Sequence, residues 1–191
     1  MTPVSSIFSY EEMMHDDNLL ERVNKKIKTD ILIKDYVKSE KGTDLFILKK
    51  DYIKQNLEKV INDFVNLRGD LFNDGIVLKE VVELKRYNGI TNEWRAFVFY
   101  GELLSLKLNS EENIISNKPD VNFINEIISK MSESIGEEMN HLYTIDVAEL
   151  EDGSWKVLEC GDGQVSGLAT TQDELEFYTL LKEKLDEIRQ S

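Results

Sequence analysis

The stretch Tyr143–Leu168, YTIDVAELEDGSWKVLECGDGQVSGL, predicts a β-hairpin that brings two carboxylates face to face. Asp152-Gly153 is a strong two-residue turn signal, and alternating apolar residues flank it on both sides. A two-residue loop there pairs Asp146 directly with Glu159, with Cβ atoms about 4.5–5.5 Å apart. Like charges on directly opposed residues destabilise a hairpin. The sequence therefore predicts an acidic pair that needs a compensating partner.

This acidic pair has two interpretations. A hard divalent cation would remove the repulsion, because Mg²⁺ takes oxygen ligands from one or two carboxylates and from substrate phosphates. The alternative is an exposed acidic rung on a very acidic protein. The side chains predicted to share the face of the pair are mostly apolar, so water alone screens it poorly: Ala148, Leu150, Trp155 and Val157. The hairpin by itself leaves both interpretations open.

The acidity of the chain restricts its partners. Its 191 residues include 37 Asp and Glu against 23 Lys and Arg, which gives a net charge of −14. Such a chain repels nucleic acid unless it carries a local basic patch, so we expect no nucleic-acid partner. We find no signal peptide and no long apolar run, so we expect no membrane partner. The single cysteine, Cys160, forms no internal disulfide and favours a reducing, cytoplasmic location.

The order of strand and helix signals predicts an α+β fold. Antiparallel hairpins dominate the pattern, and helices separate them without a regular βαβ alternation. The last helix should begin at a capping box formed by Thr171 and Glu174. Its apolar stripe comprises Leu175, Tyr178, Leu181, Leu185 and Ile188. Strands are predicted over 30–37, 44–49, 75–84, 93–100 and 103–108, in addition to the hairpin above.

Three of the predicted strands carry a cation in their apolar middle. These cations are Lys34 in DILIKDYV, Lys79 in IVLKEVVEL and Arg95 in EWRAFVF. Each alone fits a charge that reaches water at a strand edge. A buried cation needs a partner, and a metal held by two carboxylates usually has phosphates as its other ligands. Taken together, the three cations therefore favour a phosphate-bearing ligand.

The ordered segments IKDYVKS, IVLKEVVEL, EWRAFVFYGELL and YTIDVAEL…KVLECGDG resemble the ATP-grasp fold. Within it, the chain is similar to the divergent clade that contains the eukaryotic cell-division-cycle assembly factor for translation initiation factor 2 and its bacterial and phage relatives. The resemblance implies mainly antiparallel sheets in two lobes, with ATP between them and Mg²⁺ on the phosphates. The implied division is a helical lead-in over 1–29, a small lobe over 30–72 and a larger lobe over 73–191.

The resemblance also implies which basic residues contact the phosphates of ATP. Lys34 corresponds to the lysine that touches the α-phosphate, and Lys38 follows it in the polar turn that opens the candidate phosphate loop. Arg95 corresponds to an arginine that reaches the phosphates, and with Lys34 it would act in catalysis. Lys107 corresponds to a second basic contact. However, a turn at Gly101-Glu102 would place Lys107 on the other face of the sheet from Arg95.

The adenine and ribose contacts implied by the resemblance follow one strand. Lys79 and Glu80 lie on the strand that leads into the adenine hinge. The backbone of Val81 and Val82 would hydrogen-bond the adenine edge. Glu83 would bind the ribose hydroxyls.

The metal ligands implied by the resemblance are Asp146 and Glu159, the same pair that the hairpin predicts. The family usually carries Asn two residues after the second carboxylate, and this chain has Gly161 there, followed by Asp162. Asp162 would act as a third ligand if the strand ends in a bulge, which glycine favours.

The implied reaction is ligation, in which ATP phosphorylates a carboxylate and an amine attacks the acyl phosphate. A peptide or protein is the implied acceptor. Two alternatives stay open on the sequence. One is a non-catalytic ATP-binding adaptor or assembly factor for a protein partner, and the other is an interaction domain that binds no nucleotide.

Overall fold

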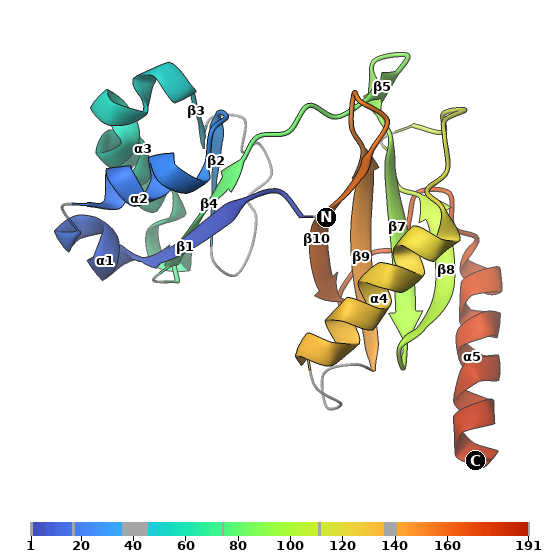
Figure 1. The fold of residues 1–191 in the computed structure, drawn as a ribbon. Coiled ribbons are helices and arrows are strands. Elements are labelled where there is room, and N and C mark those ends of the chain that lie inside the picture. Colours follow the sequence, from blue (N-terminus) through green and yellow to red (C-terminus); the bar gives the residue numbers. More distant parts are fainter. Residues whose placement is uncertain are drawn as a thin grey trace. The chain divides into compact units, whose positions relative to one another are not determined.

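The computed structural model in Figure 1 shows a chain of two compact units. One unit is Pro3–Val82, and the other is Glu83–Ser191 together with Met1–Thr2. Both combine helices with antiparallel sheets, which confirms the α+β class. In the described part of the chain, no helix is both long and apolar enough to cross a membrane. The structure describes residues 2–16, 18–35, 46–73, 75–110, 112–135 and 141–190.

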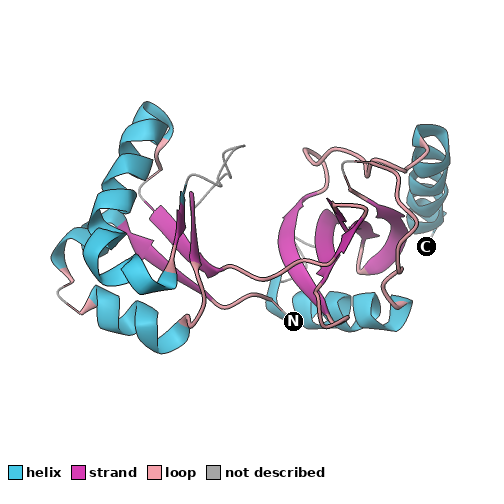
Figure 2. Cartoon of the chain, turned by 90° about the horizontal axis from the view of Figure 1, so that it is seen from above, coloured by secondary structure: helices cyan, strands magenta, loops and turns pink. Residues whose placement is uncertain are grey.

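The N-terminal unit is a four-stranded antiparallel sheet with helices packed on one face (Figures 1 and 2). Its strand order is β1-β4-β2-β3. The strands are β1 (Ser5–Ser9), β2 (Ile31–Asp35), β3 (Ile47–Leu48) and β4 (Gly75–Glu80). The helices are α1 (Tyr10–His15), α2 (Leu19–Lys26) and α3 (Ile53–Arg68), with 3-10 turns at Lys50–Tyr52 and Gly69–Leu71.

The first 29 residues do more than lead into the fold. They supply strand β1, which pairs with β4, and helices α1 and α2, whose apolar side chains enter the core of the unit. Phe8 and Val23 are buried there beside Ile31 and Ile33. Strand β4, expected in the larger lobe, therefore belongs to the N-terminal unit.

The C-terminal unit is built on a second four-stranded antiparallel sheet, in the order β10-β9-β7-β8. Helix α4 (Val121–Ile135) packs on one face of this sheet, and α5 (Glu174–Gln190) packs on the other face near β8 (Figure 1). The strands are β7 (Glu93–Phe99), β8 (Glu102–Leu108), β9 (Leu142–Glu149) and β10 (Trp155–Asp162), with a small pair β5 (Arg86–Tyr87) and β6 (Ile90–Thr91) beside them.

The β9–β10 hairpin has a three-residue loop where Asp152-Gly153 predicts two residues. The Leu150 N–H donates to the Ser154 carbonyl at 2.8 Å, so the strands close around one more residue than expected. Gly153 has a φ of +81°, a conformation that glycine adopts without steric cost. The pairing next to the loop is consequently one residue away from the predicted register.

A bulge in β10 cancels that shift. The register changes between Val157 and Glu159, so Leu158 is accommodated as an extra residue. Beyond it, Asp146 stands directly opposite Glu159, which confirms the predicted acidic pair. The predicted placement of Val157 on the same face is wrong, because Val157 packs in the core beneath α4.

The β7–β8 hairpin also differs from the prediction. Its turn lies at Tyr100-Gly101, where both residues have positive φ (47° and 76°), as a type I′ turn requires. A register shift between Phe97 and Val98 then moves the remaining pairs. Arg95 is directly opposite Lys107. The predicted separation of these two cations onto different faces is therefore wrong.

Helix α5 begins differently from its predicted capping box. The Glu176 N–H donates to Asp173 Oδ1 at 2.7 Å, while the Thr171 hydroxyl donates to the Leu108 carbonyl at 3.0 Å. Asp173 therefore caps the helix, and Thr171 ties the preceding loop to β8. The predicted apolar stripe is largely exposed, and the buried residue of this helix is Phe177.

Candidate active site

One row of charged side chains crosses all four strands of the C-terminal sheet. Lys107 on β8 pairs with Arg95 on β7, Arg95 pairs with Asp146 on β9, and Asp146 pairs with Glu159 on β10. Directly opposed residues share a face of the sheet, so this charged row presents two cations followed by two carboxylates. The neighbouring residue Ala96 points the other way, into the core beneath α4. The charged row thus lies on the face opposite α4.

The centre of the charged row is a two-pronged ion pair. Arg95 Nε lies 2.7 Å from Asp146 Oδ1, and Nη2 lies 2.6 Å from Oδ2. The two side chains are 18% and 17% exposed, so water screens the pair only in part. The third guanidinium nitrogen, Nη1, donates to the Gly167 carbonyl at 2.7 Å. Three hydrogen bonds therefore fix the plane of the guanidinium.

This ion pair answers the like-charge conflict that the sequence predicts. The hydrogen bond to Asp146 raises the pKa of Arg95 above its ordinary value, burial lowers it, and the charges of Asp146 and Glu159 raise it further. Arg95 thus neutralises an acidic pair that would otherwise face itself across two strands. Glu159 is exposed at the edge of the sheet, where a ligand can reach its carboxylate.

Lys107 is held at the other end of the charged row by helix α5. Its Nζ lies 2.8 Å from Glu176 Oε2, and both side chains are partly exposed. Since Asp173 caps the same helix, the first turn of α5 is tied to both the row and the preceding loop. The sequence predicts Lys107 as a ligand contact, and its position beside Arg95 agrees with that assignment.

Asp162 does not join the charged row. The pairing from Glu159 to Asp162 is regular, so the bulge that would turn Asp162 toward Asp146 lies before Glu159 instead of after it. Strand alternation then places Asp162 on the opposite face. Its Oδ1 accepts the Gln164 N–H at 2.8 Å, which shapes the turn after β10.

Gly161 occupies the row's face instead, at the position where the family usually carries Asn. A Cβ placed there would lie 3.2 Å from both the Thr144 hydroxyl and the Ser166 hydroxyl, a tight contact. These two hydroxyls are themselves 3.1 Å apart. The space beside Glu159 is therefore filled from neighbouring residues, and a longer side chain would displace them.

The candidate residues of the N-terminal unit lie on one face of its own sheet. Lys34 is directly opposite Val77, and Lys79 is directly opposite Leu32, so the two lysines are diagonal neighbours on adjacent strands. Such neighbours lie about 7–8 Å apart. The buried residues of β2 point to the helices, as Ile33 does, so the lysines lie on the face opposite them. The structure brings Lys34 and Lys79 together as the sequence argument expects.

The predicted adenine hinge already makes backbone bonds within the protein. The Val81 N–H donates to the Asp30 carbonyl, and the Glu80 N–H donates to the Val4 carbonyl, both at 2.8 Å. The Val81 amide is therefore engaged by its own unit. Lys38 and the candidate phosphate loop at 39–42 lie outside the described residues.

Both Glu83, the predicted ribose contact, and the adjoining Val82 end the strand segment at the division between units. Glu83 is exposed, and its carbonyl accepts the Glu151 N–H at 3.2 Å. This bond joins Glu83 to the loop of the β9–β10 hairpin, in the same unit as the charged row.

A buried carboxylate that the sequence argument missed lies on the α4 face of the same sheet. Glu149 is 1% exposed and accepts hydrogen bonds of 2.8–2.9 Å from Asn117, Lys85, Asn92 and Tyr87. Burial alone raises the pKa of Glu149, but the four hydrogen bonds outweigh it and lower the pKa to about 2. Glu149 therefore joins β9 to the β5–β6 pair and to the loop before α4. A signal existed, because a charged residue at an inward strand position needs partners.

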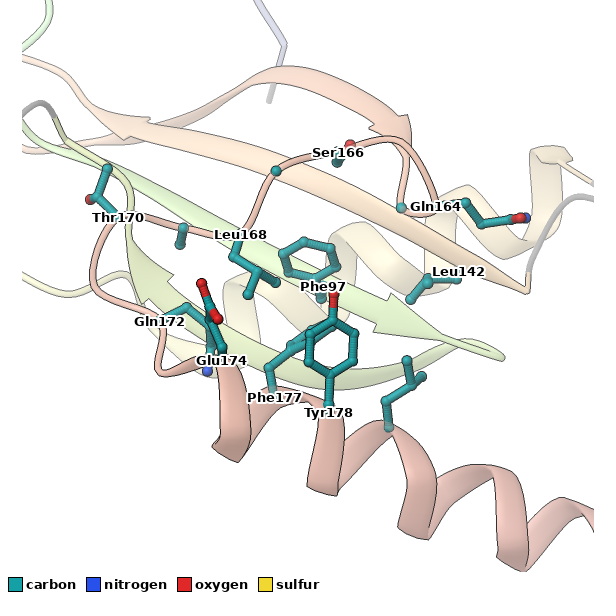
Figure 3. A pocket seen from close by; sticks show the side chains of 14 residues that line it. Phe97, Leu142, Gln164, Ser166, Leu168, Thr170, Gln172, Glu174, Phe177 and Tyr178 are labelled. Atoms are coloured by element: carbon teal, nitrogen blue, oxygen red, sulfur yellow. The ribbon is translucent and has the colours of Figure 1, made fainter.

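A pocket of about 620 Å³ adjoins the charged row on the same face (Figure 3). The loop after β10 forms one wall, and the first turns of α5 form another. Gly163 in that loop sits so close to β9 that an added Cβ would lie 2.6 Å from Leu142 Cγ. Only glycine allows this close approach, which explains the glycine spacing in the sequence GDGQVSG.

Comparison with known proteins identifies the family. The model of an ATP-grasp domain, the third family of its clade, matches residues 22–181, which is most of the chain. The chain belongs to this ATP-grasp family. No curated protein sequence is similar enough to this ATP-grasp chain to count as a match. The residues of the charged row all lie inside the matched range.

Solved structures of ATP-grasp ligases share the fold of this chain. VanG D-Ala:D-Ser ligase from Enterococcus faecalis superposes with a TM-score of 0.57 at 11% identity, covering 94% of this chain and 52% of that one. D-alanine–D-alanine ligase from Bacillus anthracis, complexed with ATP, gives 0.52 at 17% identity, with 99% and 60% covered. The ligase PsnB, complexed with minimal precursor, Mg and ADP, gives 0.53 at 12%, with 95% and 54% covered.

This ATP-grasp chain therefore spans between about half and three fifths of the length of these ligases. At such low identity, the likeness concerns the fold. All three structures are ATP-grasp ligases, and the ATP-grasp fold that they share with this chain implies ATP binding.

Proposed function

We propose that this protein binds ATP with Mg²⁺ and joins a carboxylate to an amine through an acyl phosphate. The single observation that carries the proposal is the charged row, Lys107–Arg95–Asp146–Glu159. It sets two cations and two carboxylates side by side on one face of one sheet. Phosphate oxygens need the cations, and a metal that bridges phosphates needs the carboxylates.

The donor set of the charged row fits Mg²⁺. Asp146 and Glu159 offer carboxylate oxygens on neighbouring strands, and the small ion usually takes one or two such groups plus phosphates and water. Within the described residues, no three His, Cys, Asp or Glu side chains gather into a metal site. The ion would thus be held jointly by the protein and the nucleotide, where it would neutralise charge on the phosphates. With Asp162 turned away, Asp146 and Glu159 are the proposed ligands.

Nucleotide binding would rearrange the ion pair at the centre of the row. Asp146 cannot offer both oxygens to a metal while Arg95 holds them at 2.6 and 2.7 Å. We infer that the phosphates draw the guanidinium away from Asp146 and free its carboxylate. Arg95 and Lys107 would then hold the transferred phosphoryl group, with Lys34 and Lys38 contacting further phosphate oxygens.

The remaining nucleotide contacts follow from family membership. Lys79 and Glu80 would precede the adenine, the backbone of Val81 and Val82 would face its edge, and Glu83 would bind the ribose. Since the Val81 N–H already donates to the Asp30 carbonyl, the carbonyl of Val81 is the better candidate for the adenine amino group.

The proposed chemistry has two balanced steps. An oxygen of the substrate carboxylate attacks the γ-phosphorus, and the P–O bond to ADP breaks. The amine then forms a C–N bond to the acyl carbon, the C–O bond to phosphate breaks, and phosphate and a proton are released. PsnB is complexed with a precursor, and the other two ligases are named for D-amino acids. We propose a peptide or protein acceptor for this chain.

A second candidate function is a non-catalytic ATP-binding adaptor for a protein partner, as in the assembly-factor branch that the sequence resembles. One observation favours it. Gly161 stands where the family usually supplies a third metal ligand, and Asp162 faces the other side of the sheet. A looser metal would still allow nucleotide binding but would slow phosphoryl transfer.

Titration calorimetry with a non-hydrolysable ATP analogue tests the proposal. Binding that requires Mg²⁺ and disappears on chelation is expected. ADP release should then be followed with a set of carboxylate-bearing peptides and an added amine. Tight binding with no ADP release for any acceptor supports the adaptor. The absence of both heat and thermal shift would overturn both candidates.

A further inference from the structure

The pocket beside the charged row shares a wall with it. Along β7, Phe97 follows Arg95 by two residues and therefore points to the same face, where it lines the pocket. The Gly167 carbonyl accepts from Arg95 Nη1, and Gly167 also lines the pocket. Ser166, another lining residue, hydrogen-bonds Thr144 next to Asp146 on β9. A ligand in the pocket would lie one step along the sheet from the row.

The lining of the pocket disfavours an anion. Figure 3 shows Phe97, Phe177 and Tyr178 on one side and the loop that carries Ser166 and Thr170 on the other. The described residues that line the pocket include no Lys, Arg or His, and they include the acidic Glu174. A carboxylate or phosphate would have no countercharge there, whereas an ammonium group would have one.

Gln172 supplies the polar feature that selects a hydrogen-bond donor. It lines the pocket and is 8% exposed. Its Nε2 donates to the Asp173 carbonyl at 3.2 Å and to Glu176 Oε2 at 3.4 Å, which fixes the orientation of the amide. Its Oε1 is buried and has no hydrogen-bond partner among the described residues. A buried acceptor of this kind favours a ligand that brings an N–H or O–H group.

We propose that this pocket binds the amine substrate of the ligation, as an amino group on an apolar body. The assignment rests on the proposed function, because it places the nucleophile next to the cations that would hold the acyl phosphate. The carboxylate substrate, which needs cations while it is phosphorylated, belongs to the row itself. The aromatic rings would cover the apolar body, and Gln172 Oε1 and Glu174 would receive the N–H donors.

Two small probes with one body test this assignment. 3-Methylbutylamine and 4-methylpentanoate carry the same branched chain, with an amine or a carboxylate at its end. Each is titrated at millimolar concentration into the ¹⁵N-labelled full chain, with amide signals followed by NMR. The amine should shift the signals of 163–172 and the start of α5, while the carboxylate should leave them unchanged. A carboxylate that binds there as well as the amine overturns the assignment.

Two variants sharpen the same titration. Gln172→Leu removes the buried acceptor and should weaken amine binding at least about fivefold. Gln190→Leu makes the same change at the exposed end of α5 and should leave amine binding as it is. Equal affinity in both variants would contradict the role of Gln172. The wild-type map stands without either variant, so a poorly folded Gln172→Leu does not decide the matter.

A parallel titration with Mg²⁺ and the ATP analogue separates the two levels of the proposal. Nucleotide binding without amine shifts in the pocket overturns the pocket assignment alone. Amine binding in the pocket without nucleotide binding supports the ligand class but overturns the ligase function and, with it, the role of acceptor site.

Discussion

The two sheets of this protein solve the problem of charge within a sheet in opposite ways. In the N-terminal unit, the carboxylate of Asp35 turns inward and pairs with Arg68 at 2.8 Å, with side chains 1% and 7% exposed. In the C-terminal unit, the central pair of Arg95 with Asp146 lies on the outward face and is about a sixth exposed. The first pair is sealed in a core, whereas the second is open to exchange its partners.

The lysines of the N-terminal sheet complete this comparison. The cross-strand neighbours of Lys34 and Lys79 are uncharged residues, while every member of the charged row stands beside another charge. The register of one sheet therefore sets two cations side by side, as a phosphate contact needs. The other offers both signs, as a site for phosphates with a bridging metal needs. A sealed pair is expected to govern stability, and an open pair to govern ligand binding.

The sealed pair should give the largest loss of stability. Arg68→Met leaves Asp35 buried without its guanidinium partner and should lower the free energy of unfolding by about 3–5 kcal/mol. Urea unfolding measures the change. Lys49→Met is the matched control, because it breaks an exposed ion pair with Asp30 in the same unit and should cost at most about 1 kcal/mol. Similar losses in the two variants would show that burial does not set the difference.

Glu149 should give the next largest effect, and a dependence on pH. Its folded-state pKa of about 2 lies below the ordinary 4.5, so its contribution is complete above about pH 4.5 and is lost as the pH falls toward 2. That contribution is at most about 3 kcal/mol. Glu149→Gln should lower stability at neutral pH and flatten the profile between pH 5 and pH 2. An unchanged acid profile in the variant would remove Glu149 from this role.

The open pair should cost less, and Mg²⁺ should compensate. Arg95→Met leaves Asp146 facing Glu159 with no guanidinium between them, which should cost about 1–2 kcal/mol of stability. Added Mg²⁺ should then raise the melting temperature of the variant more than that of wild type, because the ion takes over the neutralising role. Equal Mg²⁺ responses in the two proteins would argue against a shared ion.

Lys107 should give the smallest change in stability. Its pair with Glu176 is partly exposed, so Lys107→Met should cost less than about 1 kcal/mol. The same change should weaken binding of the ATP analogue severalfold, since it removes one cation from the row. Lys184→Met breaks a second bridge between α5 and β8, to Glu102, away from the row. It should leave nucleotide affinity unchanged, and an equal loss in both would assign the effect to the helix.

The acidic pair was predictable because two local features offset each other. The sequence predicts a two-residue loop, and the structure has three residues there. The extra residue at Leu158 restores the register before Glu159. The alternation of apolar residues showed both strands, but a bulge leaves little trace in a period of two. The same blindness misplaced Lys107, because the shift at Phe97 was not visible in EWRAFVF.

Other parts of the site depend on contacts that no local pattern encodes. The four partners of Glu149 come from separate segments, at 85–92 and 117, that only the fold brings to β9. The bond from Arg95 to Gly167 joins residues 72 positions apart. The fold class and the identity of the charged residues were open to sequence reasoning, while their partners were not.

The most direct test of the central claim is the affinity for the Mg²⁺ complex of a non-hydrolysable ATP analogue across three matched variants. Asp146→Asn and Glu159→Gln should each weaken binding at least about tenfold. Asp162→Asn, which removes a nearby carboxylate from the opposite face, should bind as wild type does. If all three variants keep wild-type affinity, or if Asp162→Asn alone loses it, the charged row is not the metal and phosphate site.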